Sequence, residues 1–238
     1  MVGNRLSAAV MSAELAFRHF PIILFDRMEP FLPVRIGFSI FRDAADSNAD
    51  YKRKLGSEAA LHFDTPGLDV VIEYGVWWDW DIEHLYELEA IWIYLSRDEE
   101  YLRVEASWHG GYNDMGAGGQ LRFLDGRPVL YSQPGKHAFA PTPLWFEPRE
   151  KFTPQCSKNA GSGGVLVTPL FEGKIRKDAE ADELARRYLA SRAFVPSFDF
   201  SKEWRAPSAM FVPWRLLEEW VPRRVEELIS RLKERGTS

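Results

Sequence analysis

The segment Trp77–Glu89, with the sequence WWDWDIEHLYELE, decides both the expected fold and the expected site. It places aspartates, glutamates and a histidine among tryptophans and other apolar residues. A carboxylate is normally left in water unless a partner offsets its desolvation. Acids in so apolar a segment therefore indicate a cation, a metal ion or a protonated substrate beside them, and we place the function here.

The second half of this segment has the period of a β-strand. Residues two apart in a strand share a face, so Glu87 and Glu89 would lie side by side, and Ile91, Ile93 and Leu95 would continue their face. Two carboxylates this close repel each other, which raises the pKa of one of them or requires a cation between them. The pattern predicts an acidic pair at the rim of an apolar surface.

The same alternation allows a second interpretation, in which an aromatic face is the core, the acids form a solvated outer face and His84 is a buried, hydrogen-bonded residue. That core face would comprise Trp78, Trp80, Ile82, Tyr86, Leu88, Ala90, Trp92 and Tyr94. An uninterrupted strand over residues 77–95 would be longer than the usual length of roughly three to ten residues. We therefore expect a turn or bulge near Asp81–His84, which would let His84 and the acids converge.

The rest of the sequence indicates a mainly β fold. Strands are expected at residues 31–41, 69–78, 84–95, 101–108, 128–132 and 164–171, and residues 42–58 read as a polar loop. Short strands with frequent turn signals favour a sandwich or barrel over βαβ units. Helices are expected at about 5–20, 177–192 and 213–235. We predict one domain over residues 1–238, an antiparallel β-sandwich with N- and C-terminal α-helices.

Composition excludes several classes of function. The net charge of −5 argues against a protein that binds phosphate backbones, so no nucleic-acid partner is expected. The single cysteine, Cys156, cannot form an internal disulfide or a cysteine-based zinc site. There is neither a secretory signal pattern nor an apolar run long enough for a membrane span, which predicts a cytoplasmic protein.

Two further histidines lie in turns that follow expected strands. His109 belongs to the sequence Trp108-His109-Gly110-Gly111, and His137 to Gly135-Lys136-His137-Ala138. Functional side chains are often found where strands end. Taken singly, each histidine is better explained as a turn residue that hydrogen-bonds its own loop than as a ligand, and the two support a site only if they meet His84 in space.

The order of these motifs over residues 70–145 resembles the necrosis-inducing protein family and the uncharacterised vacuolar-sorting-associated proteins related to it. His84-Leu85-Tyr86-Glu87-Leu88-Glu89 has the His-x-x-acid-x-Glu spacing of that family's motif Gly-His-Arg-His-Asp-Trp-Glu. A His-Gly turn and a Tyr-Ser segment leading to His-Ala follow in the same order, at residues 109–110 and 131–138. The resemblance implies a β-sandwich whose acids and histidine bind a divalent cation. Glu87 replaces the family's Asp, and the motif's glycine and second histidine are missing, so membrane-damaging activity is not implied.

The leading hypothesis is a metal-binding protein with one divalent metal ion, either Zn, Mn, Ca or Mg. The expected ligands are His84, Glu87 and Glu89, helped by Asp79 or Asp81. If the protein is an enzyme, the metal would activate water or polarise a substrate oxygen, and His109 or His137 would move the proton, as in a metal-dependent hydrolase.

Two other functions stay open. In the first, a non-catalytic module binds a small, carbohydrate-like or other polar ligand on Trp77, Trp80 and Trp108. In the second, the C-terminal helix is an interaction surface, although burial of its apolar stripe against the protein's own core is favoured. That stripe comprises Trp214, Leu217, Trp220, Val221, Val225 and Leu228. The substrate and the oligomeric state are not determined by the sequence.

Overall fold

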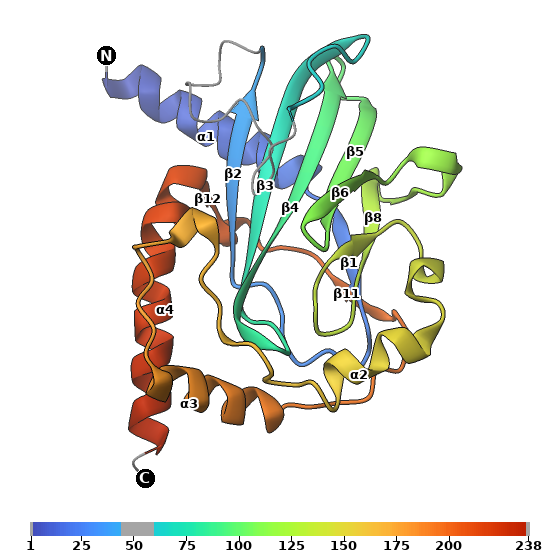
Figure 1. Cartoon of the computed structure of the whole chain (residues 1–238). Helices are drawn as coiled ribbons and strands as arrows, with labels where there is room; N and C mark the ends of the chain where they lie inside the picture. Colours follow the sequence, from blue (N-terminus) through green and yellow to red (C-terminus); the bar gives the residue numbers. More distant parts are fainter. Residues whose placement is uncertain (1, 44–59, 237–238) are drawn as a thin grey trace.

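The computed structural model describes residues 2–43 and 60–236, which form two β-sheets and four α-helices (Figure 1). The expected polar loop at 42–58 lies almost entirely outside these residues. The helices are α1 (Val2–His19), the short α2 (Thr153–Cys156), α3 (Ala179–Ala190) and α4 (Trp214–Gly236). Among the described residues, no helix combines the length and the apolar character needed to cross a membrane.

The large sheet has the strand order β12-β2-β3-β4-β5-β6, with β10 paired to β4. The small sheet has the order β11-β1-β8-β7, with β9 paired to β8. The strands of the large sheet are β2 (Arg35–Phe41), β3 (Leu68–Trp80), β4 (His84–Ser96), β5 (Tyr101–Trp108), β6 (Gly111–Asp114), β10 (Gly164–Val165) and β12 (Phe211–Pro213). The strands of the small sheet are β1 (Ile22–Phe25), β7 (Arg122–Leu124), β8 (Arg127–Ser132), β9 (Phe139–Ala140) and β11 (Lys202–Trp204).

The mainly β fold class is confirmed, but the expectation of purely antiparallel sheets is wrong. The pairs β1–β8, β4–β10 and β2–β12 are parallel. In each pair the strands come from distant parts of the chain, so no hairpin turn sets their direction. The expected strand at 164–171 is also too long, because only Gly164 and Val165 pair with β4 and Pro169–Phe171 forms a 3₁₀ turn.

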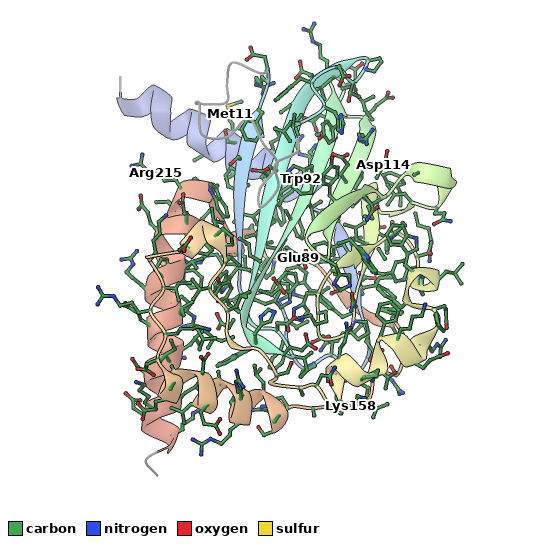
Figure 2. The ribbon with its side chains drawn as sticks, viewed as in Figure 1. Met11, Glu89, Trp92, Asp114, Lys158 and Arg215 are labelled. Carbon is green, nitrogen blue, oxygen red and sulfur yellow. The ribbon has the colours of Figure 1, made fainter. Side chains whose placement is uncertain are left out.

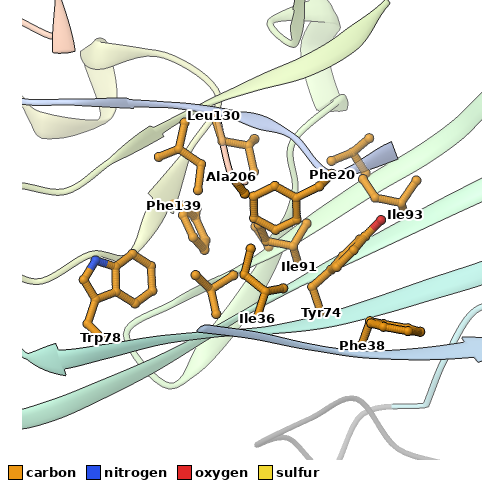
Figure 3. Close-up of a cluster of buried hydrophobic side chains, with 14 of the residues drawn as sticks. Phe20, Ile36, Phe38, Tyr74, Trp78, Ile91, Ile93, Leu130, Phe139 and Ala206 are labelled. Carbon is orange, nitrogen blue, oxygen red and sulfur yellow. The ribbon is translucent and has the colours of Figure 1, made fainter. Parts of the chain in front are cut away.

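The main hydrophobic core combines side chains from both sheets with others from α1 (Figure 3). Its buried members include Phe20, Ile36, Tyr74, Trp78, Ile91, Ile93, Leu130 and Phe139. Burial of this much apolar surface is the principal favourable contribution to folding. The two sheets are therefore held together by the faces that they turn toward this core.

A second core covers the opposite face of β3 and β4, where α3 and α4 pack against the large sheet (Figure 1). It contains Trp77, Leu85, Tyr86, Ala185, Trp214, Leu217, Val221, Val225 and Leu228. The apolar stripe of the C-terminal helix is thus buried against the protein's own core, as the sequence favoured. Because both faces of the sheet are covered where β3 and β4 approach their connecting turn, a buried polar side chain there needs a partner inside the protein.

Candidate functional site

Asp81, His84 and Glu87 form a compact group at the turn between β3 and β4. One ligand atom from each residue lies within 4.8 Å of the others, so the group could hold a metal ion. His84 Nε2 is 3.6 Å from Asp81 Oδ1 and 3.8 Å from Glu87 Oε2. The expected break in the strand brings this group together, because β3 ends at Trp80 and β4 begins at His84.

A second irregularity, at Tyr86, places His84 and Glu87 on one side of the sheet. In a regular strand, residues three apart lie on opposite faces. Tyr86 has φ of 58°, in the left-handed region that a non-glycine residue seldom adopts. Leu85 and Tyr86 both enter the core under α3 and α4, which leaves His84 and Glu87 to face Asp81. Strained backbone of this kind is concentrated at functional sites.

Glu87 and Glu89 lie at the rim of the core between the sheets, as the period-2 pattern predicted. Ile91 and Ile93 continue their face into that core, and Figure 2 shows Glu89 on β4. The interpretation of the acids as a solvated face is wrong, because Asp81 is fully buried and Glu89 is 8% exposed.

Burial and mutual repulsion change the protonation of the two glutamates. Burial first, and then the charges of Glu89 and Asp81, raise the pKa of Glu87 well above its usual range. Burial raises the pKa of Glu89 to about 7, although a hydrogen bond from the Ser107 hydroxyl opposes the shift. At neutral pH this site therefore favours bound protons or a bound cation over two free carboxylates.

Among the described residues, no strand pairs with one edge of β4 beside the site. β5 pairs with this edge only between Ile91 and Leu95, and β10 pairs with it at His84 and Leu85. Where β5 diverges, the Ser107 hydroxyl accepts a hydrogen bond from the Ala90 N–H, in place of a backbone partner. Glu87 and Glu89 project from the stretch between these two pairings.

A lysine that the sequence interpretation did not consider lies inside the group. Lys136 Nζ is 2.8 Å from Asp81 Oδ1, 3.1 Å from Glu83 Oε2 and 3.3 Å from His84 Nε2. Although burial lowers the pKa of Lys136, the charges of Asp81 and Glu87 raise it above its usual value. Lys136 belongs to the Gly-Lys-His-Ala motif that the sequence singled out for its histidine. Its spatial position, 52 residues from His84, was not readable from that motif.

The turn that carries Lys136 is fixed to the site by backbone hydrogen bonds. The Ile82 N–H donates to the Gly135 carbonyl at 2.9 Å, and the Gly135 N–H donates to Glu29 Oε2 at 2.7 Å. On the other side, Gly161 and Gly163 donate to the carbonyls of Ile82 and Glu83. The 81–84 turn is thus held between two loops of the chain.

Asp79 does not join the group, which corrects the expectation that it could be a metal ligand. Its carboxylate accepts hydrogen bonds from Arg224 Nε at 3.0 Å, from Arg224 Nη2 at 2.6 Å and from Trp77 Nε1 at 3.2 Å. Arg224 lies on α4, so this ion pair joins β3 to the helix on the far face of the sheet. The turn that follows Trp80 sends Asp81 to the other side.

The two histidines expected to move protons differ in access. His137 is fully buried, stacks on Trp78 with ring centroids 4.6 Å apart, and has Nε2 3.4 Å from Glu29 Oε1. A substrate in solution therefore cannot contact it directly. His109 is exposed on the β5–β6 turn. Partial burial of its ring lowers the pKa of His109, whereas the Gln133 side chain opposes that shift.

The three tryptophans expected to bind a ligand do not share a surface. Trp77 is fully buried, stacked on Tyr86 beneath α4, so neither of its faces is accessible. Trp80 packs on Tyr188 of α3 with ring centroids 4.4 Å apart. Trp108 is partly buried against Trp145 and Phe146. This arrangement corrects the expectation of a common stacking platform.

One oxygen of the group has unused capacity to bind a ligand, and one ring nitrogen has a lone pair that only Lys136 contacts as a donor among the described residues. Asp81 Oδ1 accepts hydrogen bonds from Lys136 and from the Glu83 N–H, but Asp81 Oδ2 is buried without a hydrogen-bond partner among the described residues. His84 Nδ1 lies 2.9 Å from the Tyr86 carbonyl, to which only a protonated Nδ1 can donate. In the neutral ring, Nε2 then carries a lone pair, and Lys136 Nζ lies 3.3 Å from it.

We found no protein-family model, no curated protein and no solved structure with significant similarity to this chain. The resemblance to the necrosis-inducing protein family therefore stays a prediction, and the chemistry of the site depends on its own residues.

Proposed function

We propose that this protein binds one divalent cation through Asp81, His84 and Glu87. The observation that carries the proposal is Asp81 Oδ2, a buried carboxylate oxygen with no hydrogen-bond partner among the described residues. An unsatisfied buried acceptor costs roughly 1–3 kcal/mol, and more when the group is charged. A cation bound by both oxygens of the Asp81 carboxylate would remove that cost.

The imidazole of His84 is oriented as metal-binding histidines usually are. Such histidines typically donate their other ring N–H to a backbone carbonyl or a carboxylate, which fixes the tautomer. The Tyr86 carbonyl does this for His84 Nδ1. Burial lowers the pKa of His84, so the ring favours its neutral, ligating form at neutral pH.

Glu89 would act beside the metal ligands rather than among them. It lies on the same face as Glu87, is held by Ser107, and contributes negative charge near the cation. The resemblance to the necrosis-inducing family, which is drawn from the spacing of His84, Glu87 and Glu89, implies the same kind of cation site. The mixed nitrogen and oxygen donors suit Zn, Mn, Ca or Mg.

The proposal is tested by titrating metal-free protein with each of these four ions, using calorimetry and elemental analysis. We expect one ion per chain. The substitutions Asp81→Asn and Glu87→Gln keep size but remove charge, and each should weaken binding by roughly 10- to 100-fold or more. Asp64→Asn is the matched control, because that side chain is 92% exposed. A parent protein that takes up none of the ions, or variants that bind like the parent, would contradict the proposal.

Metal-assisted hydrolysis is a second candidate, favoured by the exposed ring of His109, whose pKa responds to the charges of Lys136 and Asp81. Three protein ligands leave a coordination position for water, as in catalytic metal sites. His109→Ala should then lower turnover by roughly 10²- to 10⁴-fold while metal content stays unchanged. The assay screens ester, phosphodiester and glycosidic substrates with each ion. If no substrate is turned over, the site only binds.

A further inference from the structure

The ammonium of Lys136 and a bound metal ion would compete for the same space. Nζ lies 2.8 Å from Asp81 Oδ1 and 3.3 Å from His84 Nε2, which are themselves 3.6 Å apart. A cation bonded to both atoms at about 2.1 Å would therefore lie no more than about 3.6 Å from Nζ. Two positive charges at that separation repel strongly inside a protein.

We propose that Lys136 is a tethered cation that fills this site when no metal is bound, and that a divalent ion must displace its ammonium to enter. This inference rests on the proposed metal site and adds a mechanism that sets its affinity. In the metal-free protein the ammonium partly neutralises Asp81 and donates to the lone pair of His84 Nε2. Asp81 Oδ1 and His84 Nε2 would become metal ligands once Lys136 has moved.

The surroundings allow the side chain to leave without moving its backbone. Lys136 is 11% exposed, and Glu83 Oε2, 3.1 Å from Nζ, belongs to a side chain that is 22% exposed. The ammonium can therefore turn toward water while keeping Glu83 as its partner, since a lysine has a flexible four-carbon stem. The backbone hydrogen bonds that hold Gly135 to Ile82 and Glu29 need not break.

The exchange also selects for the charge of the ion. A monovalent ion would replace one positive charge by another and would lose the hydrogen bonds that Lys136 donates. A divalent ion brings an additional positive charge to a group that contains Asp81, Glu87 and Glu89. We therefore expect Na⁺ and K⁺ at physiological concentration to leave Lys136 in place.

The first experiment compares Lys136→Met with the parent by calorimetric titration with Zn, Mn, Ca and Mg. Methionine keeps an unbranched apolar stem and removes the charge. The variant should bind the preferred ion about tenfold more tightly or better, because the repulsive competitor is gone. Lys174→Met is the matched control: it removes an ion pair with Glu218 that lies outside the site and should leave the affinity unchanged.

The second experiment uses the parent protein and does not depend on how well the variant folds. Amines are labelled briefly by reductive methylation, with and without saturating metal, and each lysine is quantified by peptide mass spectrometry. Labelling of Lys136 should rise several-fold on metal binding. Lys158, which is exposed in either state, is the internal control.

The outcomes separate this inference from the proposed function. If the parent binds metal and Asp81→Asn abolishes binding, but Lys136→Met binds no better and labelling of Lys136 does not change, the tethered-cation role is overturned and the metal site stands. If neither the parent nor Lys136→Met binds an ion, the proposed function fails and this inference fails with it. If only Lys136→Met binds, the lysine occupies the site but no ion displaces it, so both the exchange and metal binding by the parent protein are overturned.

Discussion

Asp79, near the end of β3, and Asp81, in the turn that follows, are two residues apart, yet their carboxylates have opposite surroundings. Asp79 receives two hydrogen bonds from the Arg224 guanidinium and a third from Trp77. Asp81 receives one from the Lys136 ammonium and one from a backbone N–H, and its Oδ2 has no partner among the described residues. The first carboxylate is fully satisfied, whereas the second has capacity for another ligand.

The difference shows that the type of cation beside a buried carboxylate decides its role. The carboxylate either joins two structural elements through an ion pair or can bind a metal ion. A guanidinium binds a carboxylate through two parallel N–H donors, and that geometry is difficult to replace. An ammonium is a compact charge on a flexible stem, which a stronger cation can displace. Asp79 therefore joins α4 to β3, whereas Asp81 belongs to a group that can exchange its cation.

The largest expected effect comes from breaking the Asp79–Arg224 pair. Arg224→Met should lower the free energy of unfolding by roughly 3–5 kcal/mol, because it leaves a buried carboxylate without its counter-charge. Urea unfolding measures this loss, and added divalent ions should not restore it, since Asp79 lies outside the metal-binding group. Arg231→Met, which removes an exposed helix pair with Glu227, is the control and should cost less than about 1 kcal/mol. If added metal restored the stability of Arg224→Met, Asp79 would have to be a metal ligand like Asp81.

A smaller effect is expected from the pH dependence of Glu89. Its pKa is raised from 4.5 to about 7 by folding, so between these values the folded state binds the proton more tightly than the unfolded chain. The contribution of Glu89 to stability should therefore fall by roughly 2–3 kcal/mol as the pH of metal-free protein rises from about 4.5 to 7. Glu89→Gln should flatten this slope in urea titrations. An unchanged slope would mean that Glu89 titrates normally in the folded protein.

The smallest effect is expected at Glu83, the partly exposed partner of Lys136. Glu83→Gln should change the free energy of unfolding by less than about 1 kcal/mol, because Asp81 still pairs with the lysine and solvent screens this position. Thermal and urea unfolding measure the change. A loss of stability as large as that of Arg224→Met would show that the ion pairs of Lys136 with Asp81 and Glu83 are mainly structural.

Part of the site could be predicted because it depends on local geometry. The period-2 alternation placed Glu87 and Glu89 on the face of Ile91 and Ile93, and the excessive strand length indicated the turn before His84. The left-handed conformation of Tyr86 was not predictable, since no local residue pattern requires it. That single residue decides whether His84 and Glu87 face each other.

The sequence by itself determined the strands that carry the acids, the turn between them and the apolar stripe of the C-terminal helix, because hydrophobic periodicity is a property of neighbouring residues. Only the tertiary structure decided which cation meets which acid. Arg224 reaches Asp79 from 145 residues away, and Lys136 reaches Asp81 from 55 residues away. The same distant packing buried Trp77 and paired three sets of strands in parallel. Such contacts depend on how whole helices, strands and loops pack together. The residue pattern within one segment does not identify the distant residues that it will contact.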